Sequence, residues 1–280
     1  KNLFLMNNLD KKTIESFGEE WVRFNQSKME KKEAYEIFNN YFSIFPKKKL
    51  SKFSEGFDMG CGSGRWAKFI APKVGILNCI DPSRAIQVAK QNLKKFKNVR
   101  YHKKSLDNCG LKKNSQDFGY SLGVLHHVPN TNLAINSCVK LLKPGAPFLL
   151  YIYYYFDNRS SWFKFLWILT NFLRLITNKL PKMLKFLMCD LIAIFIYYPL
   201  TRIIIFLEKI GFNTKKFPLY FYRNKSFYVL RTDSRDRFGT PLEKRFTKKE
   251  IYKMMKQSGL HKIKFKNEEP FWTAIGFKKK

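Results

Sequence analysis

An acidic residue followed by three alternating glycines constrains this chain more than any other feature. Asp58 precedes Gly60, Gly62 and Gly64, in the turn that follows a predicted strand. Glycine tolerates positive φ and leaves room for a bound nucleotide close to the backbone. A phosphate-binding dinucleotide turn would need its third glycine where Arg65 stands. The spacing therefore argues against a nicotinamide or flavin fold.

Four further landmarks follow in chain order. Residues 76–80 are predicted to form a buried strand that leads into Asp81. Asp81 lies near the ~20-residue offset from the glycine turn at which nucleotide-binding α/β folds place a carboxylate on ribose hydroxyls. A third strand is predicted at 99–102, a fourth at 117–123 before His126 and His127, and a fifth at 147–152 after a Pro-Gly turn. Strands alternating with helical segments predict a parallel sheet with helices on both faces and ligands at the carboxyl ends of the strands.

In this order the landmarks resemble the class I S-adenosylmethionine-dependent methyltransferases, whose first motif is an acidic residue followed by Gly-x-Gly-x-Gly. The Leu-His-His-Val run at 125–128 is typical of their small-molecule branch, and the Asp/Asn-Pro-Pro-aromatic loop of base amino methylases is absent. A Phe-Gly-x-Glu-Trp run at 17–21 is similar to bacterial members associated with envelope or surface-glycan metabolism. The resemblance implies an α/β, Rossmann-like, seven-stranded, mostly parallel sheet with an antiparallel last strand.

The resemblance also implies S-adenosylmethionine as the cofactor. It assigns Asp81 to the ribose hydroxyls and Asp107 to the adenine amino group, with Leu106 packed on the ring. The expected cofactor-binding residues are Asp58, Gly60, Cys61, Gly62, Ser63, Gly64, Arg65, Trp66, Asp81, Pro82, Leu106, Asp107, Leu122 and Gly123. If the acceptor is a hydroxyl, His126 and His127 are the candidate catalytic bases, because imidazole titrates near neutrality. Stacking or helix capping beside the cofactor is the alternative role for both.

The C-terminal region completes the predicted domain. Thr247 and Glu250 have the spacing of a capping box, and Gly259 is expected to end the helix that starts there. Strands are predicted at 261–265 and 271–277. We therefore expect a helical cap at 1–50, a cofactor-binding domain at 51–156 and 242–280, and an inserted helical lid at 157–241.

The insertion is the least family-like part of the chain. Residues 161–178 are apolar except for one arc, a second apolar run at 186–198 is broken by Asp190, and a third covers 202–211; Pro199 is expected to end or kink the second helix. The arc consists of Lys164, Thr170, Asn171, Arg174 and Asn178. These interruptions argue against a membrane-spanning helix.

Two interpretations of the insertion stay open. One is a lid whose apolar faces bury one another above the active site. The other is an interfacial helix pair with Trp162, Phe163, Trp167 and Phe172 at the headgroup boundary of a membrane.

A charged segment follows the insertion's aromatic run. Arg231, Arg235 or Arg237 is expected to clamp a carboxylate or phosphate of the acceptor, with Asp233 or Asp236 accepting from its hydroxyl or amine. Tyr153 is expected to contribute to the same site. The alternative for 231–240 is an exposed loop whose charges pair in solvent.

Composition bounds the partners and the compartment. The net charge of +32, from 53 basic and 21 acidic residues, suits nucleic acid or anionic lipid, but the lysines are dispersed and equally fit an A+T-rich genome. No nucleic-acid-binding module is recognisable, so no specific nucleic acid is expected. The five cysteines include no Cys-x-x-Cys pair, so the sequence predicts neither a disulfide framework nor a metal site. We expect a cytoplasmic protein, in the absence of a basic-then-apolar leader, with possible peripheral membrane contact.

Three classes of function remain open. The first is methyl transfer to a small-molecule or glycan-related acceptor. The second is the same reaction on a membrane lipid or quinone precursor. The third is an RNA- or protein-directed methyltransferase, or a cofactor-binding module without activity.

Overall fold

The computed structural model describes residues 8–26 and 28–280, which divide into two compact units. Within these residues, the first unit comprises 8–26, 34–155 and 242–280, and the second comprises 28–33 and 156–241. The first unit contains the sheet, whereas the second is helical.

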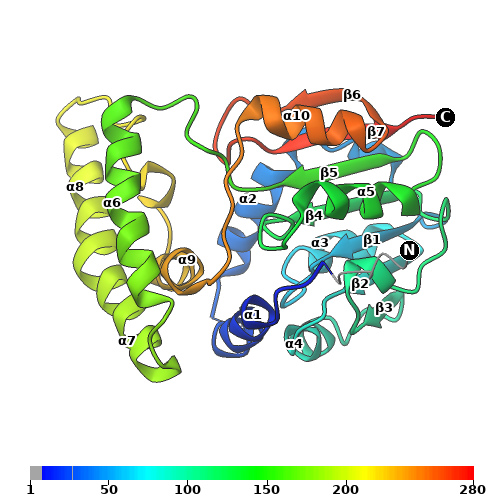
Figure 1. Cartoon of the computed structure of the whole chain (residues 1–280), viewed down its shortest axis with the longest axis horizontal. Helices are drawn as coiled ribbons and strands as arrows, with labels where there is room; N and C mark the ends of the chain where they lie inside the picture. The colour runs from blue at the N-terminus through cyan, green and yellow to red at the C-terminus, as the bar shows by residue number, and fades with distance from the viewer. Residues whose placement is uncertain (1–7, 27) are drawn as a thin grey trace, which may run out of the picture. The chain divides into compact units, whose positions relative to one another are not determined.

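In the part of the chain that the structure describes, the first unit is built on a seven-stranded sheet in the order β3-β2-β1-β4-β5-β7-β6 (Figure 1). Its strands are β1 (Glu55–Met59), β2 (Ile76–Ile80), β3 (Val99–His102), β4 (Phe118–Leu122), β5 (Pro147–Tyr151), β6 (Leu260–Phe265) and β7 (Ala274–Lys278). The first five strands pair in parallel, and β7 runs antiparallel to both β5 and β6. The predicted Rossmann-like sheet is confirmed.

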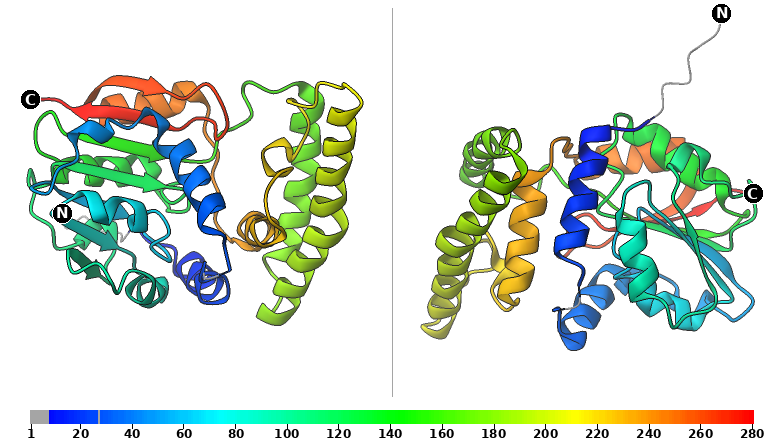
Figure 2. Two further views of the ribbon diagram at one scale, coloured as in Figure 1. Left: turned by 180° about the vertical axis from the view of Figure 1, so that it is seen from behind. Right: turned by 90° about the horizontal axis from the view of Figure 1, so that it is seen from below.

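Helices cover both faces of this sheet (Figure 2). The helices of this unit are α1 (Lys11–Arg23), α2 (Lys31–Tyr41), α3 (Ala67–Ile70), α4 (Ala85–Asn92), α5 (Thr131–Leu141) and α10 (Lys248–Gln257). On one face, buried residues of α5 and α10 pack with Phe57 and Phe148. Toward the other face, Phe42 at the end of α2 packs edge-on against Tyr120 of β4 at 5.2 Å between ring centroids. The alternation of side chains along each strand gives the sheet its two apolar faces.

The ends of α10 match the sequence pattern. The Thr247 hydroxyl accepts from the Glu250 backbone N–H, and the Glu250 carboxylate accepts from the Thr247 N–H, so the predicted capping box is confirmed. Gly259 has φ +89°, the left-handed conformation expected just after a helix end. The chain then turns directly into β6.

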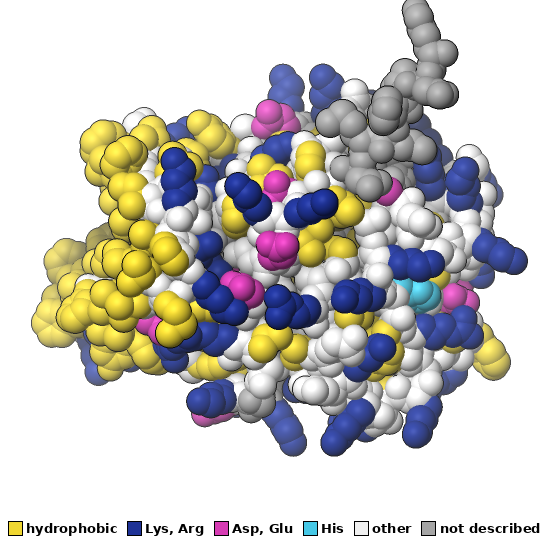
Figure 3. Space-filling model, turned by 60° about the horizontal axis from the view of Figure 1, so that its bottom comes forward, with side chains coloured by type: hydrophobic (Ala, Val, Ile, Leu, Met, Phe, Trp, Pro, Cys, Tyr) yellow, Lys and Arg dark blue, Asp and Glu magenta, His cyan; other side chains and the backbone are white. Residues whose placement is uncertain are grey.

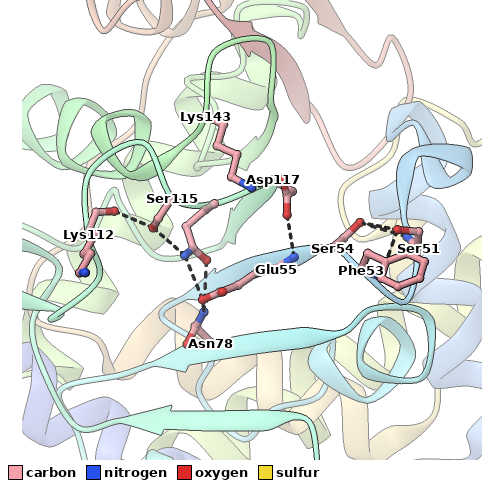
Figure 4. A network of polar contacts seen from close by, with 10 residues as sticks. Ser51, Phe53, Ser54, Glu55, Asn78, Lys112, Ser115, Asp117 and Lys143 are labelled. Carbon is pink, nitrogen blue, oxygen red and sulfur yellow. Dashed lines mark hydrogen bonds and ion pairs between the residues drawn. The ribbon is translucent and has the colours of Figure 1, made fainter.

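A buried polar network ties the beginnings of β1 and β4 to β2 (Figure 4). Asn78, fully buried in β2, donates to Oε1 of Glu55 at 2.9 Å and to Oε1 of Gln116 at 3.2 Å. Its Oδ1 lies 3.0 Å from Nε2 of His102 in β3. Asp117 accepts from the Glu55 backbone N–H. The network therefore fixes the order of these strands at the sheet end opposite the predicted cofactor site.

We expect Asn78→Ala to lower the free energy of unfolding by about 2–3 kcal/mol, because the buried Gln116 and the half-buried Glu55 and His102 lose a hydrogen bond together. Urea denaturation monitored by far-ultraviolet circular dichroism measures the change. Asn132→Ala, at an exposed position of α5, is the matched control and should change stability by less than about 0.5 kcal/mol. Equal effects of the two substitutions would contradict a stabilising role for the network.

The second unit consists mainly of long helices. They are α6 (Ser161–Thr177), α7 (Lys182–Ile192), a π turn (Ala193–Tyr197), α8 (Tyr198–Lys209) and α9 (Phe227–Gly239). Helix α9 contacts both α6 and α7, and Figures 1 and 2 show it beside them.

Pro199 does not end the second helix of this unit. Helices α7 and α8 form one continuous helix, Lys182–Lys209, with the π turn just before Pro199. A proline ring clashes with the carbonyl four residues earlier, here that of Phe195. Because Phe195 lies inside the wider π turn, the helix accommodates the ring and continues.

The charged segment at 231–240 is not a loop. It belongs to α9, in which Thr232, Ser234, Arg235 and Phe238 are buried. The alternative of an exposed loop is therefore wrong for residues 231–239. Charged residues stand on every side of this helix, so the sequence lacks the apolar stripe that predicts a surface helix.

Candidate cofactor and acceptor site

The glycine turn between β1 and α3 has the backbone that its sequence predicts. Gly60, Gly62 and Gly64 all have positive φ, between +53° and +76°. A Cβ on Gly60 would lie 2.4 Å from Cγ1 of Val124, which no side chain could tolerate. Trp21 of α1 lies directly against Gly62, so α1 flanks the turn. The turn can thus adopt this backbone and pack closely against Val124 and Trp21 because these three positions are glycines.

Asp81, at the end of β2, holds the glycine turn in place. Its Oδ2 accepts from the Gly62 N–H at 2.9 Å, and its Oδ1 accepts from the N–H and hydroxyl of Ser83 at 2.9 and 2.6 Å. Burial raises the pKa of Asp81, and the bonds from Ser83 and Gly62 oppose that rise. A carboxylate with further lone pairs, fixed at the edge of the turn, suits the acceptance of hydroxyl groups.

Asp58 carries the buried polar atom that most clearly indicates a ligand. It is the fourth residue of β1, and its Oδ2 finds no hydrogen-bond partner among the described residues. Burial raises its pKa to about 8, with the Tyr120 hydroxyl opposing and the nearby Asp81 adding to the rise. An orphaned buried carboxyl group at the carboxyl end of a parallel strand is typical of a binding site.

The loops after β3 and β4 are joined by the segment before α1. Oδ2 of Asp107 accepts from the Asn8 N–H at 3.0 Å, and the Asn8 side chain exchanges two hydrogen bonds with the backbone of Asn130. Leu106 beside Asp107 is buried. Gly123, at the end of β4, has open space where a side chain would stand. These loops border the same sheet edge as Asp81.

All fourteen expected cofactor residues lie in or directly after β1 to β4, and therefore at the carboxyl edge of the parallel sheet. Ser63 and Trp66 are buried in the turn, and the Arg65 guanidinium lies between the rings of Trp21 and Trp66, at 4.8 and 4.4 Å from their centroids. The narrow glycine turn, the hydroxyl-accepting Asp81 and the buried Asp58, whose Oδ2 has no partner among the described residues, fit a nucleoside that carries a charged amino acid. Their expected roles stay predictions.

The structure brings together His126, His127 and Tyr153. The His126 ring lies 3.9 Å from the centroids of both His127 and Tyr153. Nδ1 of His127 lies 2.6 Å from the Leu242 carbonyl oxygen. Because a carbonyl only accepts, this nitrogen carries the proton and Nε2 carries the basic lone pair.

His126 is fully buried, and neither ring nitrogen has a hydrogen-bond partner among the described residues. Burial lowers its pKa well below the ordinary value, and His127 and Arg245 lower it further. The ring is therefore neutral at physiological pH. A neutral imidazole has one N–H and one basic lone pair, and neither is used by a described residue.

The segment that returns from the insertion supplies residues that sequence reasoning missed. The Lys244 N–H donates to the His126 carbonyl, and the Phe246 N–H donates to that of Tyr153. Arg245 donates to Glu243 at 2.8 Å, and its guanidinium lies 4.9 Å from the Tyr153 ring centroid. Both side chains of this ion pair are nearly buried. A lone Glu-x-Arg between two helices follows no motif, so only the fold reveals its place beside the histidines.

The other four expected acceptor residues lie on α9 in the second unit, whereas Tyr153 belongs to the first. Arg231 donates twice to Asp190, at 2.9 and 2.7 Å. Asp233 accepts from Tyr197 and Tyr222, and the buried Arg235 guanidinium lies over the Phe186 ring. Asp236 is half-buried on the same helix. These contacts are internal to the helical unit, and binding of the acceptor there stays a prediction.

Comparison with known proteins agrees with this geometry. Residues 57–150 match a family model described as a methyltransferase domain. No curated protein matches the sequence of the chain. Among solved structures, it is similar to a chain in the complex of the Haloferax volcanii Trm112 methyltransferase activator with a putative methyltransferase, at 11% identity over 95% of this chain and 99% of that one, with a TM-score of 0.57.

A second solved structure is the YcgJ protein of Bacillus subtilis, at 15% identity over 81% of this chain and 70% of that one, with a TM-score of 0.50. At such low identity both likenesses show the fold alone. The comparisons and the strand order lead to one conclusion: residues 57–150 match a methyltransferase domain, and they lie in a sheet with the Rossmann-like methyltransferase fold.

Proposed function

We propose that this protein transfers a methyl group from S-adenosylmethionine to a small-molecule or glycan-related acceptor beside His126 and Tyr153. The observation that carries the proposal is the unpartnered, buried carboxyl oxygen of Asp58 next to a glycine turn fastened by Asp81. Asp81, Asp107 and the turn would hold the nucleoside, and Asp58 would face the charged amino-acid end. The cofactor supplies a sulfonium methyl group that is already activated for transfer.

The protein's own contribution is to fix geometry and to exclude water. His126 and His127 stand after β4, on the loop that begins at the open Gly123. If the acceptor reacts through a hydroxyl, Nε2 of His127 or a nitrogen of His126 would remove its proton. Arg245, held by Glu243, would orient an anionic or carbonyl group of the acceptor.

A membrane lipid or quinone precursor is the second candidate acceptor. The observation that favours it is the large apolar surface of the helical unit. The two candidates differ in where the acceptor is found. Incubating the protein with labelled cofactor and with separate aqueous and lipid fractions of an extract distinguishes them, because only one fraction takes up label.

Asp81→Ala tests the cofactor assignment directly. We expect the variant to bind S-adenosylhomocysteine about thirtyfold more weakly, a loss of about 2 kcal/mol, because a buried hydrogen-bonded acceptor is removed. Isothermal titration calorimetry measures the affinity. Asp117→Ala, which removes a carboxylate at the opposite end of the same sheet, is the control and should bind like the wild type.

Two results would contradict the assignment. One is the absence of S-adenosylhomocysteine binding by folded wild-type protein. The other is tight binding of NADH, which would mean that the glycine spacing does not exclude a dinucleotide.

A further inference from the structure

Helix α6 has the opposite polarity from a helix of a water-soluble protein. Its polar arc faces inward: Arg174 and Thr177 are its buried residues, and the Arg174 guanidinium donates to Asn171 and to the Thr240 and Pro241 carbonyls. Its apolar side faces outward, with Phe172 exposed to 67%. A surface helix in water normally buries its apolar stripe and exposes the polar one. The polarity of α6 indicates an apolar surrounding.

The continuous helix Lys182–Lys209 adds to the same surface. Phe195 and Phe206 are exposed to 71% and 61%, whereas Tyr197 and Thr201 are buried. Of the 28 large hydrophobic side chains exposed in the described chain, 22 lie in residues 156–241. Figure 3 shows them gathered over the helical unit. Exposed apolar residues are thus concentrated in this unit.

We call the exposed side chains of α6 and of Lys182–Lys209 the apolar face. Each large side chain has a surface of roughly 150–250 Å², and about half of it is exposed. Together these side chains give the apolar face an area on the order of 2,000 Å². The largest patch on a typical monomer covers about 300–600 Å². We propose that the apolar face binds the surface of an anionic lipid bilayer, a function separate from methyl transfer.

Charge favours a bilayer over a second copy of the chain. Residues 156–241 contain 15 lysines and arginines against 5 aspartates and glutamates. The exposed lysines cluster at the helix ends: Lys179 and Lys182 lie just before and at the start of α7, and Lys209, Lys215 and Lys216 lie at the end of α8 and just after it. Lysines at such ends reach the headgroups of anionic lipids while the apolar side chains enter the interface. Two copies of so basic a surface would repel each other.

Helix α9 favours binding on the surface of a bilayer over spanning it. Lys182–Lys209 is the one helix in the described chain that is long and apolar enough to cross a membrane. Of its most apolar stretch of 18 residues, 28% is buried. Helix α9 packs against α6 and α7 and carries Arg231, Asp233, Arg235, Asp236 and Arg237. Placing these charges at hydrocarbon depth is costly. Only the side away from α9 therefore suits lipid.

Vesicle flotation of the full chain tests the proposal. We expect the wild type to float with vesicles of phosphatidylglycerol and phosphatidylcholine, and to bind pure phosphatidylcholine vesicles more weakly. A variant with Phe172→Gln, Phe195→Gln and Phe206→Gln should lose at least tenfold in partition coefficient. These side chains are mostly exposed, so the variant should keep the wild-type melting temperature. Phe53→Gln with Tyr252→Gln is the matched control, because both residues are exposed on the first unit.

Three results would overturn the proposal. The first is equal flotation of the wild type and the triple variant. The second is a homodimer in analytical ultracentrifugation that the triple variant dissociates while neither protein floats. The third is vesicle-bound protein that resists washing with alkaline carbonate, which would indicate spanning. S-adenosylhomocysteine binding by the triple variant is measured separately and should be unchanged. A failure of this proposal can therefore be told apart from a failure of the proposed function.

Discussion

Between pH 5 and pH 8 the stability of the Asp58→Asn variant relative to the wild type should rise by about 2 kcal/mol or more. Asp58 is buried at the carboxyl end of β1 and has an orphaned Oδ2. Asparagine has nearly the same shape but no charge. The comparison therefore isolates the cost of the buried carboxylate.

The sign follows from the direction of the pKa shift. Burial raises the pKa of Asp58 in the folded protein from 3.8 to about 8. Between these values the unfolded chain has lost the proton while the folded protein still holds it, so the free energy of unfolding falls as pH rises. The loss is about 1.4 kcal/mol for each pH unit at most, and relaxation around the charge reduces it. Above about pH 8 no further loss is expected.

Urea denaturation at pH 5 and pH 8 measures the difference between the two proteins. Asp117→Asn serves as the control, because that carboxylate accepts hydrogen bonds from Glu55 and Lys143 and lies at the other end of the sheet. The control should show no gain at pH 8. A constant difference between Asp58→Asn and wild type at both pH values would show that Asp58 is not protonated in the folded protein.

The sheet and the backbone of the glycine turn were predictable because they depend on local patterns. A strand followed by a turn that only glycine can adopt, as at Gly60, leaves a signal within ten residues of sequence. The same holds for Asp81, which directly follows a buried strand. In a parallel sheet these ends meet at one edge, so the sequence order of the motifs places them together.

Residues that depend on tertiary contacts were not predictable. Arg245, paired with Glu243, reaches Tyr153 only because residues 242–246 return along the loop after β4 and the end of β5. Pro199 was expected to end or kink a helix, yet a π turn accommodates it. The charged segment on α9 was misread as a candidate loop, because a helix whose charges pair inside its own unit has no outward polar pattern. For Arg245 and for α9 the deciding contact lies far away in sequence, whereas for Pro199 it is a local change of helix type.

The polarity of the helical unit shows how a correct pattern leaves two structures open. The arc on α6 was visible in the sequence, and a helix apolar nearly all round is usually buried in protein. The structure instead packs Arg174 and Thr177 inward and leaves Phe165, Phe172 and their neighbours exposed. Periodicity gives the two faces of a helix. It does not say which of them meets the protein.

The second large effect is expected for His126→Phe, which should slow methyl transfer about a hundredfold while S-adenosylhomocysteine affinity stays unchanged. Phenylalanine preserves the stacking of the ring on His127 and Tyr153. It removes only the two nitrogens, which have no partner among the described residues. The melting temperature should therefore stay the same or rise, because a desolvated polar group is replaced by an apolar one.

This substitution separates catalysis from packing. A ring that serves only to stack would work equally well as phenylalanine, so normal turnover in His126→Phe would assign His126 to packing. Single-turnover transfer of labelled methyl groups to the purified acceptor measures the rate. His127→Phe provides the comparison: it loses the hydrogen bond to the Leu242 carbonyl, and should lower the melting temperature whether or not His127 acts as a base. A rate loss in His126→Phe without a loss of stability is the result that only a proton-accepting role for His126 explains.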